Sequence, residues 1–120
     1  MNKRTQIIIA GTSGLLAVVF GAFGSHGLKD IIRSESLEIY KTGVLYHLIH
    51  SILLLVLAMN GNVKYNHAFT IILAGIVLFS FSLYCYAITG FAVFAMITPF
   101  GGVSFLIGWI LIIVAGLKET

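Results

Sequence analysis

The feature that most constrains this chain is the stretch from Ala68 to Leu117, which contains no charged residue. One helix crosses the hydrocarbon core of a bilayer with about 20 mostly apolar residues. The stretch is too long for one such helix, so it must fold back inside the membrane. Its interruption lies between Thr89-Gly90 and Thr98-Pro99, where turn-forming residues gather.

Composition extends this conclusion to the whole chain. Of its 120 residues, 59% are hydrophobic and only 9% are charged, whereas about a quarter of the residues of a soluble domain are charged. Backbone hydrogen bonds inside lipid must be satisfied within the protein, which leaves helices or a closed barrel. The unbroken apolar runs exclude the alternating pattern of barrel strands. The sequence therefore predicts one all-α integral membrane domain over residues 1–120, folded as a four-helix bundle with short loops.

Charges and turn residues set the limits of the spans, which we place at about residues 7–26, 42–59, 68–88 and 99–117. Thr98 fits the cap of the fourth span and Pro99 its first helical position, so the apolar link 91–97 is expected in the membrane interface. The charged segment Leu28–Lys41 predicts an amphipathic surface segment between the first two spans. The basic N-terminus also fits a signal peptide, but three further spans favour an uncleaved helix.

The number of spans fixes which loops share a side of the membrane. Both termini and the loop 60–66 lie on one side, which carries the cations Lys3, Arg4, Lys64 and Lys118. The other side carries Lys29, Arg33 and Lys41. Because cytoplasmic loops carry an excess of Lys and Arg, we predict cytoplasmic termini. The net charge of +3 lies at the span ends, where it meets lipid headgroups, so the expected partner is the bilayer and not nucleic acid.

Small residues mark one face of the first span at helical spacing: Ala10, Gly14, Ala17, Gly21 and Ser25. The fourth span has a similar face. Lipid offers no hydrophobic drive between helices, so close approach of backbones supplies packing energy. We predict packing inside the bundle, with a dimer face as the alternative, at Gly14, Gly21, Gly24, Gly101 and Gly108.

Polar side chains gather in the half of the membrane opposite the termini. Polar side chains inside lipid face the interior of a helix bundle. We therefore predict a polar pocket near that membrane face, formed by Ser25, His26, Tyr46, His47, His50, Ser82 and Thr98.

The histidines admit three interpretations. His47 and His50 are three residues apart and share a helix face, and His26 lies near the same interface. Three imidazoles could hold zinc with an open fourth position, but no carboxylate or thiolate lies in these two spans. Hydrogen bonds between helices are the favoured interpretation, and proton or ligand binding is the remaining one. We predict no metal and no cofactor.

No familiar catalytic set appears in the sequence. The acidic residues are confined to the segment 28–41 and Glu119, so no Ser-His-Asp arrangement can be placed. Glycine pairs such as Gly101-Gly102 lack the lysine of a phosphate-binding loop. Cys85 lies in an apolar segment and behaves as a small hydrophobe. The sequence thus predicts a protein that is not an enzyme.

Four motifs, in order along nearly the whole chain, resemble the YgdD/YwdK-type family. They are GAFGSHGL at 21–28, TGVLY at 42–46 with His50, FSFSLY at 79–84 with Thr89-Gly90, and ITPFGG at 97–102 with Gly108-Trp109. The resemblance implies a small bacterial inner-membrane protein with four spans, relatives in animals and no established biochemical function. The family's motif positions correspond here to His26, Tyr46 and His50, whereas His47 lies outside the pattern. Phe81 stands where the family pattern has glycine.

Three hypotheses of function follow. The first is a non-enzymatic bundle whose polar pocket binds a small molecule, ion, proton or lipid headgroup. The second is a structural or assembly protein that docks another membrane protein, or a second copy of itself, through its glycine-rich helix faces. The third is a metal-dependent membrane enzyme that uses His26, His47 and His50.

Overall fold

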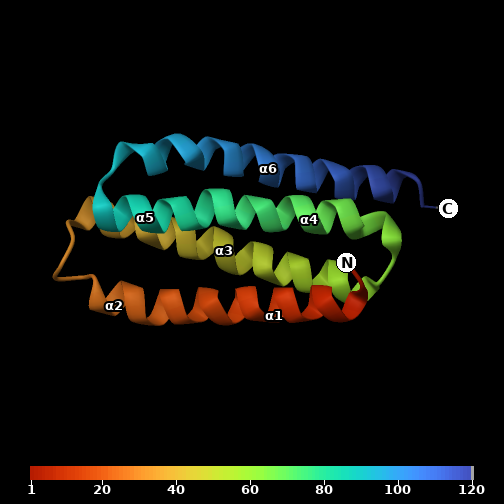
Figure 1. The fold of residues 1–120 in the computed structure, drawn as a ribbon, viewed down its shortest axis with the longest axis horizontal. Coiled ribbons are helices and arrows are strands. Elements are labelled where there is room, and N and C mark those ends of the chain that lie inside the picture. The colour runs from red at the N-terminus through yellow and green to blue at the C-terminus, as the bar shows by residue number, and fades with distance from the viewer. Residues whose placement is uncertain (120) are drawn as a thin grey trace.

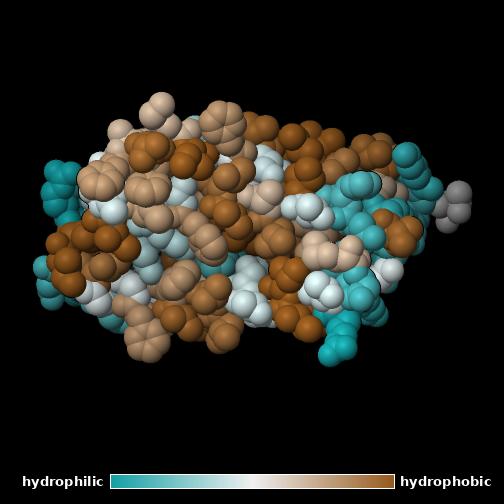
Figure 2. Space-filling view, in the orientation of Figure 1, coloured by the Kyte–Doolittle hydropathy of each residue, from teal (hydrophilic) through white to brown (hydrophobic). Residues whose placement is uncertain are grey.

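The computed structural model of the chain describes residues 1–119. Four long helices run antiparallel (Figure 1), and each is long and apolar enough to cross a membrane: Lys3–Gly27, Ser34–Asn60, Val63–Thr89 and Ala92–Leu117. Both termini and the connection between the second and third spans lie at one end of the bundle. Apolar residues cover the middle of the molecule and hydrophilic residues gather at its two ends (Figure 2). The predicted all-α, four-helix membrane bundle is confirmed.

The first and third spans each contain a π-helical turn. The first consists of α1 (Lys3–Val19), the π turn η1 (Phe20–Gly24) and α2 (Ser25–Gly27). The third consists of the 3₁₀ turn η2 (Val63–Tyr65), α4 (Asn66–Gly75), the π turn η3 (Ile76–Phe81) and α5 (Ser82–Thr89). Turns of this kind are frequent at functional sites in helices.

The second and fourth spans are the unbroken helices α3 (Ser34–Asn60) and α6 (Ala92–Leu117). Gly61 follows α3 and Gly90 follows α5, each with φ of 72°. This left-handed conformation costs glycine little, which is why the chain reverses within two residues at both places. Of the charged segment between the first two spans, residues 34–41 form the first turns of α3.

The predicted start of the fourth span at Pro99 is wrong, because α6 begins at Ala92 and Pro99 lies inside it. The Thr98 hydroxyl donates to the Phe94 carbonyl at 3.1 Å, one turn back, so it does not cap a helix start. Proline in a helix costs one hydrogen bond and crowds the preceding turn. The apolar residues 92–97 offset that cost by continuing the helix, since a helix satisfies their backbone groups better than an interfacial link would.

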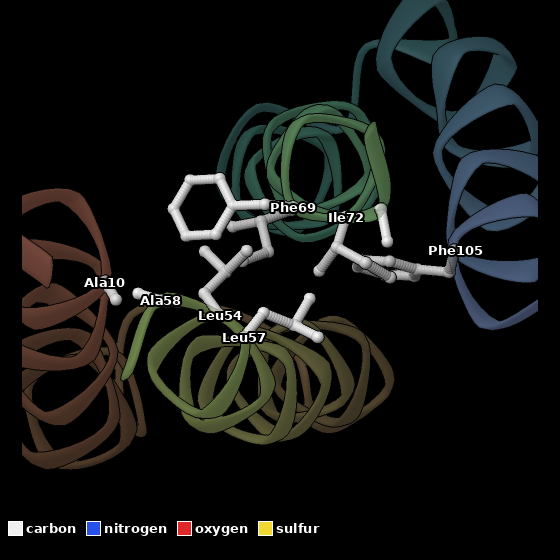
Figure 3. Packing of buried hydrophobic residues seen from close by; sticks show 9 residues of the cluster. Ala10, Leu54, Leu57, Ala58, Phe69, Ile72 and Phe105 are labelled. Carbon is white, nitrogen blue, oxygen red and sulfur yellow. The ribbon is translucent and has the colours of Figure 1, made fainter. Parts of the chain in front are cut away.

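The helices follow a zigzag order with α3 and the third span at the centre. The first span packs on α3, α3 packs on α4, η3 and α5, and these in turn pack on α6. Figure 3 shows Leu54 and Leu57 of α3 facing Phe69 and Ile72 of α4. Ala10 from α1 and Phe105 from α6 close the two sides of this core. The first span and α6 therefore lie at the margins, each with one flank free of other helices.

Two glycines of α6 allow it to lie directly on the third span. A Cβ added at Gly101 would collide with the backbone of Leu78 and Phe79 in η3, and one at Gly108 would collide with the Ile72 side chain. Backbones that approach this closely gain dispersion contacts along the helices. Gly101 is the tighter position, since backbone atoms cannot move aside as a side chain can.

Glycines on the first span perform the same task against α3. A Cβ at Gly21 would lie 3.0 Å from a Val44 methyl group, and one at Gly24 would overlap the Tyr40 ring. Gly14 has a looser contact, with nothing closer than 4.0 Å to the added carbon. Gly21 and Gly24 in η1 thus leave room for the Val44 and Tyr40 side chains of α3.

Replacing Gly101 by alanine tests the close approach of α6 to η3. We expect Gly101→Ala to lower the free energy of unfolding by about 1–3 kcal/mol, because overpacking forces the backbones apart. Thermal unfolding in detergent, followed by Trp109 fluorescence, measures the change. Gly116→Ala is the matched control on the same helix, since nothing lies within 4 Å of a Cβ there. Equal stability of the two variants would contradict the packing.

Candidate functional site

The buried polar side chains of the bundle centre on α3. His47 is 0% exposed, Ser51 2%, and Tyr40 and His50 4% each. They occupy the α3 faces that meet the first and third spans, and His50 reaches α6 through Trp109 and Phe105. A buried polar group without a partner costs free energy, so the partners of these residues decide what the site can do.

His50 uses both of its ring nitrogens. Nδ1 lies 2.8 Å from the carbonyl oxygen of Tyr46, and the indole Nε1–H of Trp109 donates to Nε2 at 3.1 Å. The carbonyl can only accept and the indole can only donate. These partners assign a neutral imidazole with its proton on Nδ1. The ring also stacks on Phe105, with centroids 3.8 Å apart, so His50 ties α3 to α6.

His47 lies in an aromatic enclosure and ties α3 to α5. Its Nδ1 lies 2.8 Å from the Tyr84 hydroxyl. The rings of Phe81 and Phe20 lie 5.3 and 6.2 Å from the imidazole centroid. Its Nε2 has no hydrogen-bond partner among the described residues, although the ring lies beside the backbone of Ser13. One polar atom of this site is therefore unused within the described chain.

Two further contacts bind the first span to α3. Ser51 donates to the His47 carbonyl at 2.7 Å, so its oxygen accepts the Ser13 hydroxyl at 2.6 Å. The Tyr40 hydroxyl donates to the Phe20 carbonyl at 2.6 Å, where η1 begins. Gly24 leaves the room in which the Tyr40 ring lies.

The remaining helix pairs are joined in the same way. Ser82 and Thr98 share a hydrogen bond of 2.6 Å between α5 and α6. Ser104 of α6 donates to the Ile71 carbonyl of α4 at 2.6 Å. Near the termini, Gln6 of α1 donates to the Asn66 side chain of α4 at 3.1 Å. Hydrogen bonds thus connect every adjacent pair of spans.

The predicted pocket residues fall into separate groups. Tyr46 and His50 lie together toward α6, His47 faces α5 and the first span, and Ser82 pairs with Thr98. Ser25 and His26 lie at the end of the first span, His26 is exposed, and neither side chain hydrogen-bonds to a described residue. Five hollows on the described bundle are lined by neither His47 nor His50.

The donor atoms do not converge on a metal position. Within residues 1–119, no three His, Cys, Asp or Glu side chains lie close enough together to hold an ion. His47 and His50 share a face of α3, but their rings point to different neighbouring helices, as their partners Tyr84 and Trp109 show.

Several partners in this network were absent from the predicted set, notably Ser13, Ser51, Tyr40 and Trp109. Ser13 could have been found, since Gln6, Ala10, Ser13 and Ala17 follow one another at spacings of four, three and four and are all buried. Trp109 gave no such signal, because its position along α6 does not show which residue of α3 its indole meets.

The described geometry is that of a four-span bundle, and comparison with known proteins shows which family the chain belongs to. Residues 20–102 match the family described as "Protein of unknown function (DUF423)". The chain belongs to the DUF423 family. The resemblance predicted from the four motifs is thereby confirmed.

Relatives of this DUF423 chain match it over most of their length. It is 44% identical over 120 residues to the "UPF0382 membrane protein YwdK" of Bacillus subtilis (strain 168), which covers 96% of this chain and 98% of the relative. It is 38% identical over 122 residues to the "UPF0382 inner membrane protein YgdD" of Escherichia coli (strain K12), covering 98% and 93%. No solved structure matches the chain. This DUF423 chain is a multi-pass protein of the bacterial cytoplasmic membrane.

Proposed function

We propose that this chain is a non-catalytic assembly protein that receives one transmembrane helix of a partner membrane protein. The observation that carries the proposal is a lateral groove along the first span. The polar side chains support it indirectly. Because they bond to one another between helices, few of their donors and acceptors remain for a substrate.

The lateral groove lies between the first and third spans. Three successive hollows of about 220, 330 and 380 Å³ form it. The first two share Leu16 and Phe81, and the last two share Phe20. The groove has α3 behind it, because the first span packs on α3 and leaves its other flank open.

The dimensions of the lateral groove match a helix better than a small ligand. Its lining on the first span extends from Ile8 to Gly27. At 1.5 Å per residue this is about 30 Å, the thickness of the hydrocarbon core. Gly27 lines one end of it and has nothing within 4 Å of an added Cβ. An open glycine facing a groove permits the backbone of another helix to approach.

Site-specific photocrosslinking in native membranes tests this function. We expect a photoreactive phenylalanine analogue at Leu16, which lines the groove, to give one adduct of defined mass with a partner protein. The matched control is Leu15, which is adjacent, at the same depth and 64% exposed to lipid. Val77→Trp, at the groove wall, should fill the space and abolish the Leu16 adduct.

Three results would contradict the proposal. Equal adducts at Leu15 and Leu16 would indicate random encounter, and adducts with lipid alone would show that acyl chains fill the groove. An adduct between two copies of this chain would assign the groove to a homo-oligomer.

A second candidate function, the binding of a small hydrogen-bonding molecule or a proton, is favoured by two unused polar atoms. His47 Nε2 and Ser80 Oγ have no partner among the described residues, and both side chains are 0% exposed. His47 lies on α3 and Ser80 in η3, two elements that pack on each other. Buried polar atoms of this kind are commonly satisfied by an ordered water or a ligand. We propose that an ordered water or a small hydrogen-bonding ligand satisfies one or both of these atoms.

The stability of a Ser80→Ala variant tests whether the Ser80 hydroxyl has a hydrogen-bond partner. If a bound molecule satisfies it, Ser80→Ala should lower the free energy of unfolding by about 1 kcal/mol. Ser82→Ala gives the reference for a bonded hydroxyl in the same helix, since Ser82 bonds to Thr98. Thermal unfolding in detergent measures both. A gain in stability for Ser80→Ala would mean that the hydroxyl is truly unpaired and would contradict this second function.

A further inference from the structure

A cavity at the end of the bundle that carries the termini combines cationic and apolar walls. Its volume is about 370 Å³, and it lies between the start of the third span and the end of α6. Its lining consists of Lys64, His67, Leu111, Val114, Ala115 and Lys118. It lies far from the polar groups around His47 and His50 along the bundle axis, among the hydrophilic residues that gather at this end in Figure 2.

The charges around this cavity favour an anion. Lys64 and Lys118 come from different spans and both line it. Lys3 and Arg4 lie at the same end of the bundle, whereas Asp30, Glu35 and Glu38 lie at the other. Opposite charges in a partly closed site attract more strongly than in open water. A ligand of this cavity would therefore carry negative charge.

Glu119 already shows how an anion is held here. Its carboxylate forms an ion pair with Lys64. Within residues 1–119, Lys118 forms no ion pair. The Glu119 side chain is 61% exposed, so solvent reaches this ion pair and another anion can displace the carboxylate. The Glu119 carboxylate thus competes with any other anion for Lys64.

The apolar wall of this cavity favours a lipid over a free anion as its ligand. On α6, Val114 lies one turn and Leu111 two turns before Lys118, toward the hydrocarbon. Lys64 Nζ lies 5.2 Å from the centre of the Tyr65 ring, and a tyrosine with a lysine is typical of a membrane interface. A cavity that is cationic toward water and apolar toward hydrocarbon suits an amphiphile. Basic pockets between spanning helices bind the headgroups of anionic lipids.

We propose that this cavity binds the phosphodiester headgroup of an anionic phospholipid, with its phosphate between Lys64 and Lys118 and an acyl chain along Leu111 and Val114. Glu119 acts as a competing internal anion. The site is independent of the lateral groove, so either proposal can fail without the other. A free phosphate ester carries the same phosphate group as a phospholipid. The test must therefore distinguish binding of the lipid from binding of a soluble phosphate ester.

Native mass spectrometry of the full chain in detergent, titrated with phosphatidylglycerol, tests the site. Wild type should retain one phosphatidylglycerol in preference to phosphatidylcholine. Lys64→Gln and Lys118→Gln should each weaken retention about fivefold. Glu119→Gln should strengthen retention, because it removes the competing carboxylate. Lys29→Gln with Lys41→Gln, at the other end, is the matched control and should leave retention unchanged.

Each alternative outcome overturns the proposal. Equal retention of the two lipids would exclude recognition of an anionic headgroup. Equal loss in the two pairs of lysine variants would mean nonspecific attraction to positive charge. Retention of glycerol 3-phosphate as tight as that of phosphatidylglycerol would assign the cavity to a soluble phosphate ester. Weaker retention in Glu119→Gln would show that Glu119 supports the site and does not compete for it.

Discussion

The interaction on which this structure depends is the hydrogen bond between polar side chains of different spans. Hydrocarbon offers no water to a buried imidazole, hydroxyl or indole, so each must find its partner in the protein. His50 with Trp109, His47 with Tyr84 and Ser82 with Thr98 meet this demand across three helix pairs. Each such bond contributes about 0.6–2 kcal/mol in a membrane. Their larger effect is on register, because a helix that slides by one turn separates several donors from their acceptors.

Glycine contacts and hydrogen bonds support each other in this bundle. Gly101 brings α6 onto the backbone of η3, and the bond between Ser82 and Thr98 lies one turn from that contact. Gly24 makes room for the Tyr40 ring, whose hydroxyl reaches the Phe20 carbonyl. Side chains as short as those of serine and threonine can form hydrogen bonds across an interface only where the backbones approach closely. The first span contacts α3 on one side only, and the lateral groove lies along the side that no other helix covers.

The sequence predicts the architecture well and the site less well, for physical reasons. Charge distribution and apolar length determine how many spans a chain forms, so the four spans and the position of the loops follow from composition. The start of α6 does not, because Pro99 favours a helix start locally while the apolar residues 92–97 extend the helix. The residues of the polar pocket were predicted from their depth alone. Depth does not fix direction around the helix axis, and the structure places His47 and His50 against different neighbours.

Three parts of the molecule thus have distinct chemistry: a hydrogen-bonded polar interior, an apolar flank and a cationic cavity at the end that carries the termini. The central claim is that the interior histidines hold helices together. Nitrogen-15 NMR of ring-labelled histidine in lipid bilayers tests this claim most directly. The account predicts that His50 is neutral, with its proton on Nδ1 and an unprotonated Nε2, and that Trp109→Phe changes the Nε2 resonance. A proton on Nε2, or a resonance that does not respond to Trp109→Phe, would contradict it.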